Sequence, residues 1–253
     1  MISVLEAFES APGSLSLAEI SVRSGTPIST THRLVAELAS FGVLERTSSG
    51  RYQVGIRLWE LAQKAGRQLR EAARPRVQDL AAITNQSVLI SVRQGRDSLL
   101  IERAHGDRQA ARMSKVGSRL PLHASAAGKV LLAFEAEWIK RAYLAEPLQR
   151  LTRETHVDRE LLERELTLAA QDGYAQSLEE VRAGASAIAV PVFHLGHIAA
   201  SLSIVTEAFR VSQLKKYLPA LRATAAVIEE TTRHLPRDAL LGAGNDSPPS
   251  AAE

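Results

Sequence analysis

The sequence of 253 residues contains no cysteine. Disulfide bonds, a catalytic thiolate and zinc sites with cysteine ligands are therefore excluded. The chain also lacks any run of the roughly 18 apolar residues that a membrane-spanning helix requires. Its first residues, MISVLEAFES, have no basic segment ahead of a hydrophobic stretch, as a secretory signal peptide would have. These absences fit a cytoplasmic protein without a membrane partner, which is our expectation, although they do not require one.

A large excess of one charge is missing as well. The formal net charge is +3, so a surface that binds nucleic acid would have to arise from local clustering of basic residues. Residues 1–60 contain five arginines and six glutamates, a net charge of −1. Residues 23–57 contain all five of these arginines but two of the glutamates, a net charge of +3. A weakly basic segment thus lies between more acidic ones.

Hydrophobic residues are plentiful and make up 45% of the chain. A chain of this length can bury the core of one large domain or of two modest ones. Apolar spacing and turn signals predict three short helices within the first forty residues. The second begins with Ser16 and Glu19, a pair in the S-x-x-E capping pattern, and ends at Gly25. Its inward-facing residues are expected to be Leu17, Ile20 and Val22.

The third helix is predicted to begin with Thr26 as its N-cap and Pro27 as its first residue. A step of 100° per residue assigns two faces to it. The buried face is expected to contain Thr31, Leu34, Val35, Leu38 and Phe41. The opposite face, with Thr30 and His32 on its flanks, contains Ser29, Arg33, Ala36 and Ser40. Serine and threonine are poor helix formers, but short polar side chains and one arginine at a helix start suit contact with base edges and phosphates.

A short hairpin is predicted to follow, with strands VLER at 43–46 and RYQV at 51–54 around the turn TSSG. Arg46 and Arg51 flank this turn, where the arginines of a wing would contact phosphates. Three helices and a hairpin make a winged helix-turn-helix over residues 1–56, and the predicted DNA-binding residues are Ser29, Thr30, His32, Arg33, Arg46 and Arg51. The alternative is a small helical subdomain with a solvated polar face.

Residues 57–74 are predicted to form one amphipathic linker helix that ends at Pro75. Leucine and small residues recur along one side, and the other side is basic. A mid-chain helix of this kind needs a partner, which favours dimerisation. The residues expected in this seam are Leu58, Leu61, Ala65 and Leu69. The alternative is a surface helix packed against its own chain.

Residues 75–235 alternate between strand and helix patterns. Strands are expected at 87–95 and 97–106, another at 112–117, and a hairpin at 187–205 that turns at Leu195 and Gly196. The expected helices lie at about 75–84, 125–136, 158–172 and 211–233. This pattern predicts an α+β domain. Residues 236–253 are rich in glycine, proline, serine and alanine and are predicted to be a disordered tail.

The segment GSRLPLHASAAGKVLLAF, residues 117–134, has a specific pattern of glycine, proline, histidine and lysine. Together with the predicted winged helix and with AIAVPVFHLGHIAASLSIV at 187–205, it resembles the IclR-type family of bacterial transcription regulators. The resemblance extends from VLEAF near the N-terminus to about Leu235. It implies a winged helix-turn-helix, a linker helix and a larger GAF-like domain that senses an effector. It also implies a homodimer or homotetramer that binds double-stranded operator DNA and responds to a small metabolite.

An effector pocket is a further implication of this resemblance. The positions that match the pocket walls of the family are Leu120, Ala126, Ala127, Ser177, Ala185, Ala187 and Ser203. Ser177 replaces an acidic residue of some members, Ala187 a cysteine, and Val205 a serine. We therefore expect a more apolar pocket, which favours an aromatic or aliphatic acid over a small, highly polar oxo-acid.

The stretch LHASAAGK offers a candidate anion site within this pocket. Ser125 can cap a helix that opens with Ala126, Ala127 and Gly128, so amide N–H groups converge where no bulky side chain blocks access. On the residues alone, Ser125 could simply cap a helix that packs close to a sheet. The resemblance favours the effector site and implies a small-molecule carboxylate as the ligand.

No motif of a common enzyme class or cofactor site is present: the chain lacks G-x-S-x-G, a Walker loop, G-x-G-x-x-G and H-E-x-x-H. We therefore expect neither an enzyme nor a cofactor. His194 and His197 have the spacing of metal ligands but no third partner in the sequence, so no metal site is predicted. An esterase-like hydrolase that uses Ser125 and His123 is the alternative from a different class.

Overall fold

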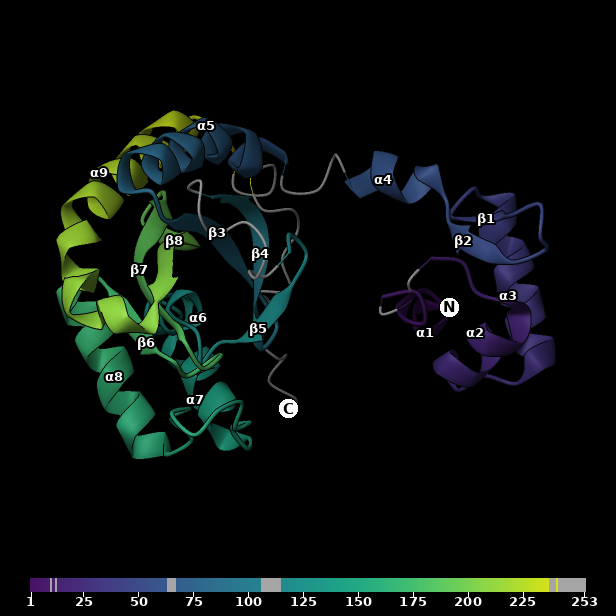
Figure 1. Cartoon of the computed structure of the whole chain (residues 1–253), viewed down its shortest axis with the longest axis horizontal. Coiled ribbons are helices and arrows are strands. Elements are labelled where there is room, and N and C mark those ends of the chain that lie inside the picture. Colours follow the sequence, from purple (N-terminus) through teal and green to yellow (C-terminus); the bar gives the residue numbers. More distant parts are fainter. Residues whose placement is uncertain (10, 12, 63–66, 106–114, 237–239, 241–253) are drawn as a thin grey trace, which may run out of the picture. The chain divides into compact units, whose positions relative to one another are not determined.

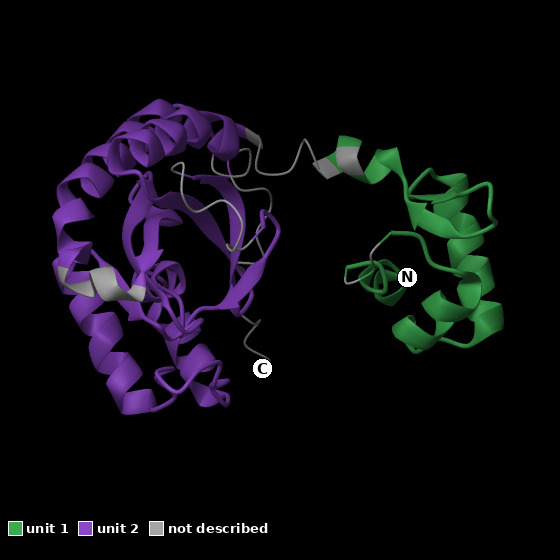
Figure 2. Ribbon diagram, viewed as in Figure 1, with its two compact units in different colours: residues 1–65 green, residues 66–253 purple. Residues whose placement is uncertain are grey.

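The computed structural model describes all residues except 10, 12, 63–66, 106–114, 237–239 and 241–253. The chain forms two compact units, Met1–Ala65 and Gly66–Glu253 (Figures 1 and 2). Their boundary lies inside the segment 57–74 that the sequence predicts as one linker helix. Among the described residues, no helix is both long and apolar enough to cross a membrane.

The N-terminal unit has the predicted order of helices and hairpin. Helices α1 (Ile2–Glu6), α2 (Leu17–Ser24) and α3 (Ile28–Ser40) precede the antiparallel strands β1 (Leu44–Arg46) and β2 (Tyr52–Val54). Val4, Ile20, Val35 and Leu44 from four of these elements meet in one core, and each is at most 1% exposed. The first sixty residues therefore form a winged helix-turn-helix.

Local sequence signals set the ends of α2. The Ser16 side chain accepts a hydrogen bond from the Glu19 N–H at 3.3 Å, and the Glu19 carboxylate accepts one from the Ser16 N–H at 2.7 Å. Gly25 ends the helix in the left-handed conformation with a φ of +64°. The prediction for Val22 was wrong, because its side chain is 82% exposed. It lies two residues after the buried Ile20, which is 200° around the helix axis.

Helix α3 differs from its prediction at both ends. Pro27 is its N-cap and Ile28 its first residue, so the predicted start lies one residue too early. Thr31, Val35 and Leu38 are buried as predicted. Phe41 was predicted to be buried but is 69% exposed. It is the C-cap, with φ −90° and ψ 2°, and therefore no longer follows the helical spacing.

The C-terminal unit is organised around one antiparallel sheet. Within the described residues, its six strands lie in the order β5 (Arg119–Pro121), β4 (Asp97–Ala104), β3 (Ser87–Gln94), β8 (His197–Glu207), β7 (Ala185–His194) and β6 (Ala175–Leu178). The β7–β8 hairpin turns at Leu195 and Gly196, as predicted, and both have positive φ angles of 50° and 82°. Strand β6 was not predicted.

Helices cover both faces of this sheet. On one face, α5 (Arg67–Thr84) and α9 (Leu218–Thr232) lie side by side, and α9 follows the 3₁₀ segment η1 (Ala208–Tyr217) (Figure 1). On the other face, α6 (Ala126–Ala133) packs against the central strands and against α8 (Arg159–Asp172). Helix α7 (Glu137–Ala145), which was not predicted, follows α6. Coverage of both faces explains why five consecutive residues of β3, Ser87–Ser91, are buried.

The segment 57–74, predicted as one linker helix, contains parts of two described helices, and residues 63–66 between them lie outside the described residues. Helix α4 (Ile56–Ala62) belongs to the N-terminal unit, and α5 starts at Arg67 and continues through Pro75 to Thr84. A proline removes one backbone hydrogen bond inside a helix. Here the helix is anchored on both sides of it by Leu69, Ala73, Val77 and Leu80, which are at most 2% exposed. Packing against the sheet therefore outweighs the local stop signal.

Two further predictions concern segments that the structure describes only in part. The strand predicted at 112–117 falls largely on residues outside them, and Lys115–Gly117, which are described, are not part of a strand. In the predicted tail 236–253, Leu240 is described and is fully buried in the core of the C-terminal unit. The tail prediction was therefore wrong at Leu240, because this leucine contributes apolar area to the core.

Candidate DNA-binding surface and ligand pocket

The polar face of α3 is open to solvent. Ser29, His32 and Arg33 are exposed, and Thr30 is half-buried. On the opposite side, the fully buried Thr31 hydroxyl lies 2.7 Å from the Thr26 hydroxyl and donates to the Pro27 carbonyl at 3.1 Å. This buried polar contact fixes the start of the helix and leaves the neighbouring side chains free to face a partner.

The two arginines of the wing have different surroundings. Arg46 is exposed, with its guanidinium 6.0 Å from the centre of the Tyr52 ring. Arg51 donates to the Ser14 carbonyl at 2.8 Å and forms an ion pair with Glu19 at 2.7 Å. The Ser16 N–H and hydroxyl, followed by the Arg51 charge, hold the pKa of the Glu19 carboxyl below its usual value. Arg51 therefore connects the hairpin to the start of α2, whereas Arg46 has no such tie in the described hydrogen-bond network.

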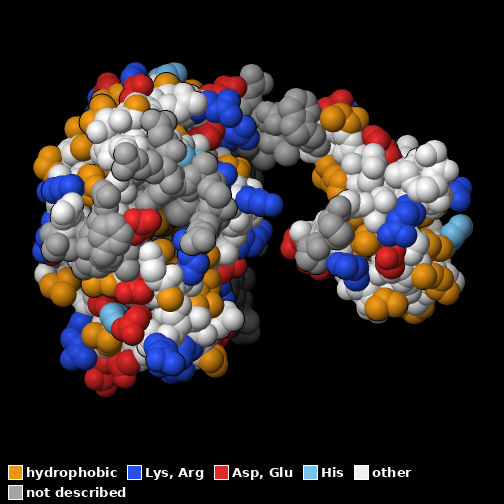
Figure 3. Space-filling view, in the orientation of Figure 1, with side chains coloured by type: hydrophobic (Ala, Val, Ile, Leu, Met, Phe, Trp, Pro, Cys, Tyr) orange, Lys and Arg blue, Asp and Glu red, His pale blue; other side chains and the backbone are white. Residues whose placement is uncertain are grey.

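Basic side chains do not cover a broad area of the face shown in Figure 3. On the face shown in Figure 3, lysine and arginine lie singly or in small groups between acidic and hydrophobic side chains. This distribution agrees with the small net charge of +3.

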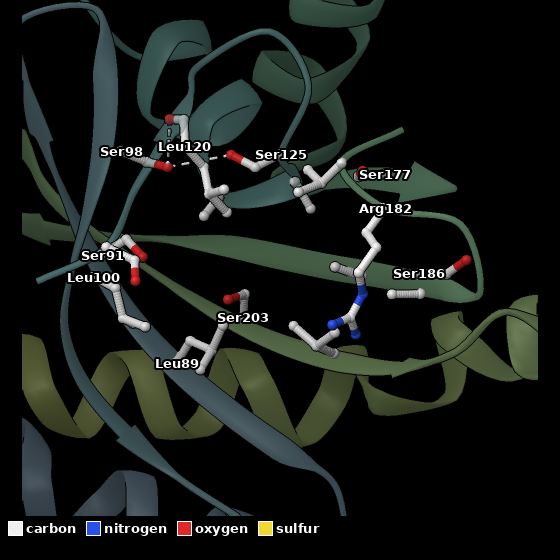
Figure 4. Close-up of a pocket in the computed structure, with 17 residues that line it drawn as sticks. Leu89, Ser91, Ser98, Leu100, Leu120, Ser125, Ser177, Arg182, Ser186 and Ser203 are labelled. Carbon is white, nitrogen blue, oxygen red and sulfur yellow. Dashed lines mark hydrogen bonds between the residues drawn. The ribbon is translucent and has the colours of Figure 1, made fainter. Parts of the chain in front are cut away.

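A pocket of about 120 Å³ lies in the C-terminal unit, between the sheet and the start of α6 (Figure 4). For scale, a cavity of roughly 150 Å³ in another protein accommodates benzene. Alternate residues of the strands point into it, such as Leu89 and Ser91 of β3. All eight predicted effector-binding residues line it: Leu120, Ser125, Ala126, Ala127, Ser177, Ala185, Ala187 and Ser203.

The start of α6 forms one wall of this pocket. Ser125 is the N-cap, and its hydroxyl accepts a hydrogen bond from the Gly128 N–H at 3.0 Å. A Cβ atom on Gly128 would lie 2.5 Å from the backbone of Leu122, so the close approach of the helix to the preceding loop requires glycine. The N–H groups of Ala126 and Ala127 belong to the first helical turn, where no intrahelical acceptor exists. These two amides are available to an acceptor in the pocket.

The lining contains more serines than the sequence analysis named. Seven serines are among the described lining residues, and four of them were not predicted: Ser91, Ser98, Ser118 and Ser186. Several hydroxyls are bonded to the chain itself. Ser177 donates to the Ala124 carbonyl at 2.7 Å, and Ser98 donates to the Leu120 carbonyl at 3.2 Å. These two serines therefore brace the pocket wall as well as lining it.

One charged residue lies among the described lining residues, and it was not predicted. Arg182 stands in the turn between β6 and β7 and is exposed at the rim, whereas Ser125 and Ala126 are 5% and 1% exposed. Figure 4 shows the Arg182 side chain extending from this turn in the direction of Ser203. The sequence contained one signal for it, the cluster LEEVRAG between two strands, but a charged turn is common on any protein surface.

A buried ion cluster lies behind the pocket. Lys129 of α6 is 2% exposed, and its ammonium group lies 2.7 Å from Glu180 and 2.8 Å from Glu165. His156 contacts Glu165 at 2.7 Å. His156, Glu165 and Glu180 are the one group of possible metal ligands in the described part of the chain, and the lysine ammonium already pairs with both carboxylates. Burial raises the pKa of the Glu180 carboxyl, and the Lys129 charge opposes this rise.

The geometry does not assemble a serine and histidine pair for hydrolysis. Nδ1 of His123 lies 2.8 Å from the Tyr143 hydroxyl, and Nε2 lies 2.9 Å from the Gln149 carbonyl. Both ring nitrogens are therefore occupied by groups other than Ser125. Burial lowers the pKa of His123, which is 2% exposed. His123 thus holds α7 and the following loop against the pocket loop.

The described residues among those predicted for dimerisation differ in burial. Leu61 is 47% exposed and Leu58 is half-buried, both on α4. Leu69 is 1% exposed within the core beneath α5, so its assignment to a seam between chains was wrong. Ala65 lies outside the described residues. Leucine spacing alone could not separate a seam between chains from a face packed on the chain's own sheet.

Comparison with protein-family models identifies the family to which this architecture belongs. Residues 1–48 match the IclR helix-turn-helix domain, and residues 63–230 match the C-terminal domain of IclR bacterial transcriptional regulators. The chain belongs to the IclR family. It is thus a transcription regulator that binds DNA through its helix-turn-helix domain, and members of this family are not enzymes.

Individual relatives cover most of the chain. The HTH-type transcriptional regulator XynR of Escherichia coli strain K12 is 31% identical over 219 residues, 83% of this chain and 85% of that protein. The HTH-type transcriptional repressor AllR of Klebsiella pneumoniae is 33% identical over 217 residues, 83% of this chain and 79% of that protein. A crystal structure of an IclR homologue from Microbacterium hydrocarbonoxydans, complexed with 4-hydroxybenzoate, is 31% identical with a TM-score of 0.84. That similarity covers 91% of this chain and 96% of the homologue.

Proposed function

We propose that this regulator binds a pseudo-palindromic operator as a homodimer or homotetramer, in the bacterial cytoplasm, and that an organic acid in the pocket modulates this binding. Each chain presents one recognition helix, α3, and a twofold-symmetric oligomer matches a palindromic site. Exposed apolar residues on α4, Ile56 at 62% and Leu61 at 47%, support contact between chains next to the DNA-binding unit.

The observation that carries the acid proposal is the position of the α6 N-terminus in the wall of the pocket. Unbonded amides and the helix dipole favour an anion, by up to about 2 kcal/mol in a partly buried site. Ser177 occupies a position at which a carboxylate would repel an acid. The 4-hydroxybenzoate complex of the Microbacterium homologue supports an organic acid as the class of effector.

A thermal-shift screen of organic acids against their neutral amides tests this assignment. Ligand at about a hundred times its dissociation constant stabilises the native state by roughly 2.7 kcal/mol. We expect acids that fit the pocket to raise the melting temperature, and their matched amides to have little effect. The acids that raise it should also change the operator affinity in gel shifts. Equal stabilisation by acids and amides would contradict an anion site at α6.

A further inference from the structure

The pocket of this regulator has two polar ends with different exposure. At the buried end lie the amides of Ala126 and Ala127, which are 1% and 8% exposed. At the rim lies Arg182, the one charged residue among the described lining residues. Apolar side chains such as Leu89 and Leu100 line the same pocket. A ligand that fills the pocket would therefore meet a hydrogen-bond donor site at each end and an apolar wall along its body.

The turn that carries Arg182 is held in place by buried bonds. Glu180, two residues earlier and 2% exposed, accepts hydrogen bonds from the Lys129 ammonium at 2.7 and 2.9 Å. The Glu180 carbonyl also accepts one from the Thr155 hydroxyl at 2.7 Å. At the other side of the turn, the Ala185 N–H donates to the Arg182 carbonyl at 3.2 Å. These contacts fix the backbone on both sides of Arg182.

Lys129 connects the two ends of the pocket. It lies on α6, three residues after Ala126, and its ammonium group binds the carboxylate that anchors the turn. Breaking a buried ion pair by removing one partner is costly, since it leaves a charge unpaired away from water. The helix start and the Arg182 turn are therefore held at a set separation.

We propose that Arg182 determines effector specificity by binding a second acceptor group, so that effectors with an acceptor at each end bind better than simple monocarboxylic acids. This inference rests on the proposed acid site at α6. The first carboxylate binds the Ala126 and Ala127 amides in the buried end, and the guanidinium at the rim binds a second carboxylate or a hydroxyl. An arginine bound to a carboxylate forms charge-assisted, often bidentate hydrogen bonds, which are stronger than neutral ones.

Titration calorimetry with benzoate, 4-hydroxybenzoate and terephthalate tests the proposal on the full-length chain. These probes share one ring and one carboxylate and differ in the group at the opposite end. We expect the wild type to bind terephthalate at least ten times more tightly than benzoate. In Arg182→Gln this preference should fall to about twofold or less, and the benzoate dissociation constant should stay unchanged. Arg119→Gln, which removes an exposed arginine beside Leu120, is the matched control and should keep the preference.

A second variant tests the anchoring of the turn. Glu180→Gln keeps the shape of the side chain and leaves Lys129 paired with Glu165 at 2.8 Å, so the fold should survive, as circular dichroism can check. We expect it to reduce the terephthalate preference less than Arg182→Gln does, with unchanged benzoate binding. Glu163→Gln, at an exposed position of α8, should leave the preference intact.

The possible failures point to different conclusions. Unchanged preference in Arg182→Gln would overturn the inference. An equal loss of benzoate and terephthalate binding in that variant would place the first carboxylate on Arg182 and would also overturn it. Failure of all three acids to bind the wild type would contradict the inference and its premise together. Acid binding that depends on Arg182 but leaves operator affinity unchanged would support the inference and contradict the proposed function.

Discussion

The two units of this regulator present their polar groups in opposite ways. In the N-terminal unit, polar side chains such as Ser29 and Arg33 project outward from one continuous helix. In the C-terminal unit, the polar groups of the pocket face inward, and they come from one helix start, one turn and the strands β3, β4, β6, β7 and β8. A large partner such as DNA can be reached by exposed side chains, whereas a small ligand must be enclosed. The first arrangement can be read from a short stretch of sequence, and the second requires the fold.

The largest effect is expected from Leu69→Asp, compared with Leu61→Asp. Leu69 is 1% exposed in the core beneath α5, so a buried charge there should cost several kcal/mol and unfold the C-terminal unit. Leu61 is 47% exposed, and its replacement should leave stability within about 0.5 kcal/mol. Circular dichroism on heating measures both.

The same pair of variants tests the oligomer. If α4 contributes to a contact between chains, Leu61→Asp should reduce the molecular mass measured by light scattering and weaken operator binding. A normal oligomer with normal operator affinity in Leu61→Asp would show that α4 has no partner there.

Arg33→Ala should have the next largest effect, on the recognition of sequence by α3. We expect it to lose roughly 1–3 kcal/mol of discrimination between operator and random DNA. Arg46→Ala, on the exposed wing, should weaken binding to all DNA sequences alike. It should also reduce by about one unit the slope of the logarithm of the binding constant against the logarithm of the salt concentration. Gel shifts at several salt concentrations separate these outcomes. If Arg33→Ala lost equal affinity for operator and random DNA, Arg33 would not contribute to sequence recognition.

Arg51→Ala sharpens the comparison between the two wing arginines. Because Arg51 bonds Ser14 and Glu19, its loss should lower the stability of the N-terminal unit by about 1 kcal/mol. Its phosphate contact, predicted from the sequence, remains a prediction. Thermal unfolding followed by operator titration decides between the roles, since reduced affinity with unchanged stability would favour the phosphate contact.

The smallest effect concerns pH and His123 in the C-terminal unit. Burial lowers the pKa of His123, so the unfolded chain takes up a proton before the folded chain does as the pH falls. The contribution of this histidine to stability is therefore full above its ordinary pKa of about 6.5, and it is lost as the pH falls below that value, with a slope of at most about 1.4 kcal/mol per unit. Urea unfolding between pH 5 and 8 measures the slope, which should decrease in His123→Gln.

Sequence patterns predicted most of the fold because the signals were local. The Ser16 and Glu19 capping box, the stop at Gly25 and the turn at Leu195 and Gly196 each depend on a few adjacent residues. The continuation of α5 through Pro75 could not be predicted, because packing on a sheet formed later in the chain decides it.

Some residues of the candidate pocket could likewise be predicted from the sequence, and others could not. Its predicted residues came from the family resemblance, and the structure brings all of them to one cavity. Arg182 and Ser91 were missed because their positions depend on strand pairing and on the buried Lys129 and Glu180 pair. Single-sequence periodicity contains no information on such contacts between distant segments.

The most direct test of an acid site at α6 is the response of operator binding to acid in Ala126→Pro. Proline is accepted at a first helical position, and Ser125 has the extended backbone, with φ −93° and ψ 144°, that a residue before proline requires. The substitution removes one amide donor from the buried end of the pocket. Operator affinity should be titrated, for wild type and variant, against the acid that raises the melting temperature of the wild type most. We predict equal operator affinity without acid and a requirement for at least fivefold more acid in the variant, whereas an identical acid response in both proteins would contradict the account.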